Sequence, residues 1–245
     1  MLSFFNSVVY EPIYNALAFV IGVVPYGDVG VAIVIITILV RLILFPLSLK
    51  ASRTQVAMRE IDPKLKSLRE QFKDNKEELA RKTMALFKEH KVNPFASFLL
   101  ILIQIPIVIG LYLVFLREGT VASFDPALLY SFITAPLTVS FSFLGLIDIT
   151  GKSIILALIV AITQYFYARL TLPKPGVATP AGQSFKDDLA RSMNVQMRYV
   201  FPIMLGVISY IASAAIALYF VTSNLFGIVQ ELVARRLHHG AQQPH

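Results

Sequence analysis

One arginine in the middle of an apolar run constrains this chain more than any other feature. From Val29 to Leu49 the only charged residue is Arg41. As a helix this run is about 30 Å long, the thickness of the hydrocarbon core of a bilayer. Arg41 precedes Lys50 by roughly 14 Å along the helix axis, which is further than its side chain comfortably reaches toward the membrane surface. Because a central arginine costs on the order of 3 kcal/mol to insert, something must solvate it.

The composition is that of an integral membrane protein. Of the 245 residues, 56% are hydrophobic, and the mean hydropathy is +0.67. The chain has no cysteine, which excludes disulfides and thiolate metal sites. Its net charge of +7 comes from basic residues that lie in loops between the apolar runs. We therefore interpret this charge first as a signal of membrane topology, and only second as a sign of a nucleic-acid partner.

The first 92 residues predict one span with a helical element on each side. Residues 1–26 contain no Lys or Arg, and we expect an outer interfacial helix there, centred on Glu11 to Val24, with an additional span as the alternative. Residues 29–49 form the first span. Between Lys50 and Lys91, twelve basic residues outnumber seven acidic ones, so this loop is predicted to be cytoplasmic. Its helical spacing of apolar residues predicts a hairpin over 51–92, whose second helix starts at a capping box of Asp74 and Glu77.

The rest of the chain, from residue 95 onward, predicts four further spans. Residues 127–147 are apolar but are broken by Pro136, and we expect a re-entrant or interfacial outer element, because a crossing here would place the next basic loop outside. Residues 199–234 would make a single helix of about 54 Å, so a hairpin that splits near Ser209 to Ser213 is expected. The predicted architecture is all-α and polytopic, with the N-terminus outside and the C-terminus inside: spans 29–49, 95–116, 153–171, 199–210 and 212–234, a cytoplasmic loop 172–198 and a basic tail 235–245.

Several polar residues in the spans predict a hydrated cavity around Arg41. Counted from the cytoplasmic ends of their spans, Gln104, Asn224 and Arg41 all reach a depth of roughly 14 to 17 Å. Thr37 lies one turn from Arg41 on the same helical face, and Gln164 is shallower. A cavity that is wet and open to the cytoplasm would explain why the arginine is tolerated. The alternative for Gln104 and Asn224, and also for Thr163 and Ser223, is a hydrogen bond that joins two helices.

The sequence lacks the arrangements that catalysis needs. No pair of intramembrane aspartates, no HExxH motif and no phosphate-binding glycine loop is present. The tail residues His238 and His239 have no companions that would complete a metal site. We therefore predict a protein that is not an enzyme and that uses no cofactor or metal.

Five short motifs resemble those of the YidC/Oxa family of membrane protein insertases. They occur in the family's order within residues 10 to 235 and are RLILFPL around Arg41, DPK at 62–64, KVNP at 91–94, LIQIP at 102–106 and LYFVTSNL at 218–225. The resemblance implies a five-span core with a positively charged groove, open to the cytoplasm and lipid, that receives the polar part of a substrate helix. Arg41 and Thr37 match groove residues, and Tyr219 matches an aromatic residue that contacts substrate. Phe220 stands where the family often has a second tyrosine.

This resemblance implies a multi-pass protein of the cell (inner or cytoplasmic) membrane that inserts and helps to fold nascent membrane proteins. The predicted groove residues are Arg41, Thr37, Gln104, Gln164, Tyr219 and Asn224. The expected partners are nascent membrane proteins and the lipid bilayer, together with the ribosome, the Sec translocon and targeting factors, which the basic hairpin and tail would meet. The alternatives are a small-anion or solute transporter that binds its substrate at Arg41, and a scaffold that only assembles other membrane proteins.

Overall fold

The structure is a computed structural model that describes residues 2–90, 96–118, 124–172 and 195–241. The KVNP motif, most of the loop 172–198 and the end of the tail lie outside these residues. In chain order the elements are α1 (Leu2–Phe5), η1 (Asn6–Tyr10), α2 (Glu11–Val23), η2 (Pro25–Gly27), α3 (Val29–Ile43), α4 (Phe45–Gln71), α5 (Lys76–Glu89), α6 (Ala96–Glu118), η3 (Pro126–Leu128), β1 (Ser142–Phe143), β2 (Ile147–Asp148), α7 (Ile154–Thr171), η4 (Gln196–Val200), α9 (Phe201–Ala212) and α10 (Ala214–Ala241). The predicted all-α class is confirmed.

Two helices of the described residues are long and apolar enough to cross a membrane by themselves. They are Ile154–Thr171 and the Ala214–Arg236 part of α10, and a third appears if Val29–Ile43 and Phe45–Ala51 form one interrupted span. Leu102–Phe115 and Gln196–Ala212 are apolar but shorter. The apolar helices therefore overlap the five predicted segments, while the number of crossings stays a prediction.

The first predicted span is not one continuous helix. The sequence indicated an unbroken run over 29–49, but α3 ends at Ile43, and α4 begins at Phe45 and continues to Gln71. Pro46 explains the break, because it lacks an N–H group and its ring clashes with the carbonyl four residues earlier. The helix that enters the hairpin thus starts several residues before position 51.

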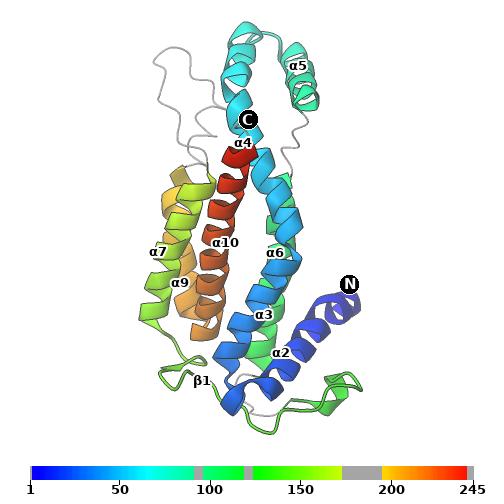
Figure 1. The fold of residues 1–245 in the computed structure, drawn as a ribbon, viewed down its shortest axis with the longest axis vertical. Coiled ribbons are helices and arrows are strands. Elements are labelled where there is room, and N and C mark those ends of the chain that lie inside the picture. The colour runs from blue at the N-terminus through cyan, green and yellow to red at the C-terminus, as the bar shows by residue number, and fades with distance from the viewer. Residues whose placement is uncertain (1, 91–95, 119–123, 173–194, 242–245) are drawn as a thin grey trace. The chain divides into compact units, whose positions relative to one another are not determined.

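The chain divides into two compact units. The first comprises Met1–Ile43 and Gln104–Val229, and the second comprises Leu44–Ile103 and Gln230–His245. In the second unit, α4 and α5 form the expected helical hairpin around the buried residues Ile61, Leu65 and Leu86 (Figure 1). The predicted capping box was wrong in its register: the Asn75 side chain, not Asp74, accepts a hydrogen bond from the Glu78 N–H at 3.0 Å.

In the first unit, α7, α9 and α10 pack side by side (Figure 1). Their shared core contains Val160 of α7, Leu205 of α9 and Ala217 of α10. Gly206 allows α9 to approach α7 closely, because a Cβ atom there would lie 3.0 Å from the carbonyl oxygen of Ala157. Small residues at such contacts are a common means of packing membrane helices.

The second core of this unit lies where α2 and α3 meet. Tyr14 and Leu17 of α2 are buried against Ala32 and Ile33 of α3. The helix expected at the interface, centred on Glu11 to Val24, is thus present as α2 and buries one of its faces within the protein. Whether its other face lies in a membrane interface stays a prediction.

Residues 124–151 form a mostly irregular segment that is anchored by polar side chains. Asn15 accepts a hydrogen bond from the Tyr130 N–H at 2.7 Å and donates one to the Leu128 carbonyl at 2.9 Å. The Tyr14 hydroxyl accepts from the Asp125 N–H at 2.6 Å. We call Tyr14, Asn15 and Asp28, with the backbone groups of residues 124–151 that they bind, the polar clasp.

Asp28 is the most constrained member of the polar clasp. Its carboxylate is buried at the start of α3, where Oδ1 accepts from the Val31 N–H at 3.0 Å, and Oδ2 accepts from the Leu144 N–H at 2.7 Å. Before it, Gly27 has a φ of +63°, and a Cβ atom there would lie 2.0 Å from the carbonyl oxygen of Thr138. Glycine is therefore required at this close approach.

The end of the segment 124–151 also forms hydrogen bonds with the start of α10. The N–H groups of Ala214 and Ala215 donate to the carbonyls of Gly151 and Ile149 at 2.8 and 2.9 Å. These are first-turn N–H groups that have no acceptor within the helix. The segment that the sequence assigned to a re-entrant or interfacial element therefore caps the starts of α3 and α10, and its position relative to a membrane stays a prediction.

Candidate functional site

Arg41 lies in the last turn of α3 with its side chain half-buried. Its Nε donates to the Ser223 hydroxyl oxygen of α10 at 3.0 Å, and its Nη2 donates to the same oxygen. Among the described residues, no Asp or Glu forms an ion pair with Arg41. Within the described part of the chain, the partner of this charge is therefore a neutral hydroxyl, which does not cancel the positive charge.

Tyr219 extends the contacts of Arg41 to a third helix. It lies one turn before Ser223 on α10, is 3% exposed, and accepts a hydrogen bond from Nε2 of Gln104 on α6. The Tyr219 hydroxyl also contacts Ser223, and it interacts electrostatically with the positive charge of Arg41. We call Arg41, Gln104, Tyr219 and Ser223 the arginine network, which links α3, α6 and α10.

Thr37 lies beside the arginine network without joining it. It is buried one turn before Arg41 on α3, and its hydroxyl donates to the Ile33 carbonyl at 2.7 Å. Such a bond to the preceding turn is a common way to satisfy a threonine in an apolar helix. The side chain is on the predicted face, but its hydroxyl is already used by the backbone.

Asn224 and Gln164, which the sequence grouped with Arg41, have a different environment. Asn224 of α10 donates to the Thr163 hydroxyl of α7 at 3.2 Å, and both side chains are buried. Gln164 follows Thr163 on α7 and is also buried. Although Asn224 directly follows Ser223, the two side chains bind different helices. The hydrogen bond of Asn224 is of the kind that joins helices.

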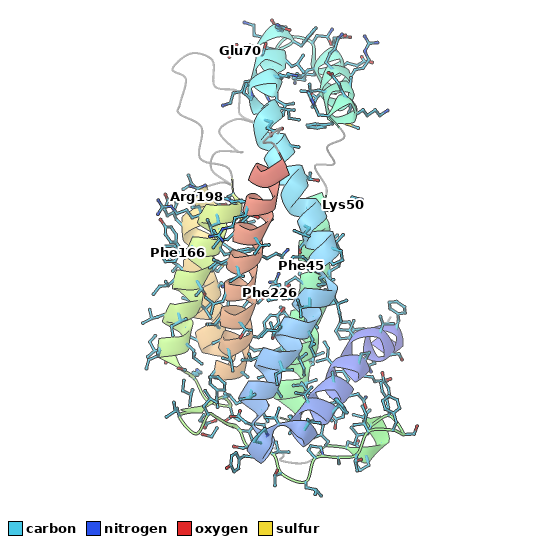
Figure 2. The ribbon with its side chains drawn as sticks, in the orientation of Figure 1. Phe45, Lys50, Glu70, Phe166, Arg198 and Phe226 are labelled. Atoms are coloured by element: carbon cyan, nitrogen blue, oxygen red, sulfur yellow. The ribbon has the colours of Figure 1, made fainter. Side chains whose placement is uncertain are left out.

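Two polar residues were missed as site candidates by the sequence analysis. Ser223 was considered only as a residue that joins helices, although its position four residues after Tyr219 indicates a shared face. Arg198, labelled in Figure 2, was interpreted as a loop charge. It is 7% exposed and donates to the Leu172 carbonyl, just after the last turn of α7, at 3.2 Å. No pattern in the sequence distinguishes it from the solvated arginines of the loops.

The chemistry available at the arginine network is anion binding. A guanidinium carries five N–H groups, and those at Nη1 have no hydrogen-bond acceptor among the described residues. The described residues contain no cluster of His, Asp or Glu that would hold a metal ion. A carboxylate is the natural partner of an arginine whose charge is not neutralised.

Comparison with known proteins gives one consistent family. Residues 22–241 match the family described as the 60Kd inner membrane protein. The chain is 32% identical over 213 residues to the membrane protein insertase YidC of Clostridium tetani, covering 87% of this chain and 84% of the relative. It is 31% identical over 235 residues to the YidC protein of Fusobacterium nucleatum, covering 92% and 96%. The YidC protein of Francisella tularensis subsp. novicida is 29% identical over 96% of this chain, which corresponds to 36% of that longer relative.

Proposed function

Because this chain belongs to the YidC/Oxa family of membrane protein insertases, we propose that it inserts nascent membrane proteins into the cell membrane through a hydrated groove centred on Arg41. The observation that supports this role for Arg41 is its chemistry: a half-buried cation in an apolar helix, with a neutral hydroxyl as its partner. In the proposed groove, water completes its solvation. Because a charged residue within a membrane segment is unfavourable to insert, we infer a functional role for it by default.

The arginine network would receive the polar tail of a client. Each unsatisfied backbone group of the tail costs several kcal/mol in hydrocarbon, so a groove that carries water partway across the membrane shortens the dry path. Arg41 attracts acidic residues of the tail more strongly than it would in water, because the local dielectric is lower. Gln104 and Tyr219 offer polar contacts beside it. We include Thr37, Gln164 and Asn224 as lining residues, of which Thr37 is nearest to Arg41 in the sequence.

The apolar part of a client would leave along exposed helix faces. On α7 the residues Ile155, Leu158 and Ile162 are exposed, and Phe166 projects from the same helix (Figure 2). On α10 the exposed apolar residues include Leu225 and Val229. Burial of the client's own helix in lipid, at about 25 cal/mol per Å² of apolar surface, provides the driving force without a nucleotide.

The hairpin of α4 and α5 would contact anionic partners in the cytoplasm. Its exposed basic residues include Lys64, Lys66, Arg69, Lys73, Arg81 and Lys88. Their charge suits ribosomal RNA, and targeting factors or the Sec translocon are further proposed partners of this hairpin and of the tail. This part of the proposal also requires that the N-terminus lies outside and the C-terminus inside.

The proposal is tested by Arg41→Ala and Arg41→Lys in proteoliposomes. Client insertion is measured by protease protection, with two single-span clients whose translocated tails are acidic or neutral. Because a hydrogen bond to a charged group contributes about 1.5–3 kcal/mol, Arg41→Ala should slow insertion of the acidic client by roughly tenfold or more. Arg41→Lys keeps the charge and should retain much of the activity if charge alone matters.

Arg169→Ala is the matched control, since it removes the same charge from an exposed position in the last turn of α7. Normal insertion of both clients by Arg41→Ala would contradict the proposal. Anion flux through proteoliposomes without a client, lost in Arg41→Ala, would instead favour the transporter alternative.

A further inference from the structure

Arg41 uses one particular edge of its guanidinium to bind α10. The planar group offers a side edge, formed by Nε and Nη2, and an end edge, formed by Nη1 and Nη2. Both atoms of the side edge donate to the Ser223 hydroxyl, with Nε at 3.0 Å. No described residue accepts a hydrogen bond from Nη1. The end edge is therefore the part of Arg41 that is available to a ligand.

Ser223 is itself held firmly. It is 1% exposed, and its neighbour one turn earlier, Tyr219, is anchored by Gln104 of α6. The Ser223 hydroxyl also contacts the Tyr219 hydroxyl. A buried side chain with these contacts has one preferred position, so the guanidinium edge that it binds is fixed as well.

We propose that Ser223 is a positioning residue: it holds the side edge of Arg41, so that the end edge receives a carboxylate of the client tail in a two-point hydrogen-bonded pair. The inference depends on the proposed function, because it assigns the residue that orients Arg41 for its client. Two parallel N–H to oxygen bonds require a fixed plane, and a swinging arginine would form them less often.

The neutrality of Ser223 is part of this role. A hydroxyl accepts hydrogen bonds from the guanidinium without cancelling its charge, so the attraction for an acidic tail remains. An aspartate at the same position would form an ion pair with Arg41 and compete with the client carboxylate. A hydroxyl at this position should therefore keep the selectivity for acidic tails, a methyl group should reduce it, and a carboxylate should abolish it.

The experiment compares Ser223→Ala, Ser223→Thr and Ser223→Asp in the full-length protein in proteoliposomes. The readout is the ratio of insertion rates of the acidic-tail and neutral-tail clients, which a general loss of folding does not change. Ser223→Ala should lower this ratio by roughly three- to tenfold, the worth of one hydrogen bond. Ser223→Thr should keep the ratio, and Ser223→Asp should lower it to the level of Arg41→Ala.

Thr222→Ala is the matched control. It removes a neighbouring hydroxyl that donates only to the Leu218 carbonyl of its own helix, at 2.8 Å, and it should leave the ratio unchanged. A second measurement follows the reaction of Arg41 with phenylglyoxal by mass spectrometry. Its rate should rise severalfold in Ser223→Ala and remain unchanged in Thr222→Ala.

The outcomes separate this inference from the proposed function. If Arg41→Ala loses acidic-tail selectivity while Ser223→Ala and Ser223→Asp keep it, the positioning role is wrong and the proposed function stands. Unchanged reactivity of Arg41 in Ser223→Ala would also overturn the positioning role. If Arg41→Ala itself keeps the selectivity, the proposed function fails, whatever the Ser223 variants show.

Discussion

The polar clasp and the arginine network are two polar clusters in the same apolar unit, and they are built differently. In the polar clasp, Asn15 and Asp28 bind backbone N–H and carbonyl groups. In the arginine network, side chains bind side chains, and Arg41 remains half-exposed with N–H groups unused. The first arrangement leaves little capacity for a ligand, whereas the second retains it.

This difference separates structural from functional polar groups within a membrane protein. Burial alone does not separate them, because Asp28, Tyr219 and Ser223 are all buried. The distinguishing quantity is the unused hydrogen-bonding and charge capacity that remains after the internal contacts are made. By this measure we propose that Arg41 is a binding group and that Asp28 is a structural one. The comparison predicts that changes in the polar clasp alter stability, and that changes in the arginine network alter client selectivity.

The largest stability effect is expected for Asp28→Ala. This change removes the cap of α3 and leaves the Leu144 N–H without its acceptor, at a cost of about 2–3 kcal/mol in the free energy of unfolding. Leu144 has a φ of 51°, an unfavourable conformation for leucine that the bond to Asp28 helps to hold. The measurement is unfolding in mixed detergent micelles, monitored by circular dichroism.

Asp28→Asn is the matched control for that experiment. It keeps one carbonyl oxygen for the Val31 N–H and should lose only about half as much. The clients' relative insertion rates should stay at the wild-type ratio in both variants. A changed ratio of insertion rates at unchanged stability would contradict the structural role of the polar clasp, because it would show that the clasp takes part in client recognition.

A smaller effect is expected for Thr163→Val, which removes the acceptor of Asn224 with little change of shape. Hydrogen bonds between membrane helices contribute about 0.6 kcal/mol on average, so the free energy of unfolding should fall by about that amount. The acidic-to-neutral client ratio should not change if Asn224 acts between α7 and α10. A selective loss of acidic-tail insertion would instead support the proposed role of Asn224 as a lining residue of the Arg41 site.

The smallest effect is expected from Asp148, an exposed residue next to the polar clasp. The pKa of its carboxyl lies below the ordinary value of 3.8, chiefly because the Thr150 hydroxyl and then the Thr150 N–H donate to it. A lowered folded-state pKa gives stability that is present above the unfolded value and is lost as the pH falls through the folded one. The melting temperature of Thr150→Val should therefore approach that of the wild type below about pH 4. An equal difference at pH 3 and pH 7 would contradict this assignment.

The sequence predicted most of the helical segments but not their interruptions or caps. Hydropathy and basic flanks located the segments that contain α7 and α10, because these signals depend on composition within one stretch of chain. The predicted hairpin split, near Ser209 to Ser213, contains the observed break at Ser213. The break at Leu44 was missed because Pro46 lies within an apolar run that hydropathy treats as uniform. The Asn75 cap was missed because Asp74 is an equally good capping residue type.

The sequence alone establishes that a single arginine lies within the apolar run Val29 to Leu49 and needs solvation, because charge and hydropathy are properties of one stretch of chain. The packing of the helices was needed to show that Ser223 binds Arg41, and that Asn224, the next residue, binds Thr163 instead. The physical reason is that helical periodicity tells which residues share a face of their own helix. Which neighbour that face meets depends on how all the helices pack, and this information is spread over the whole chain.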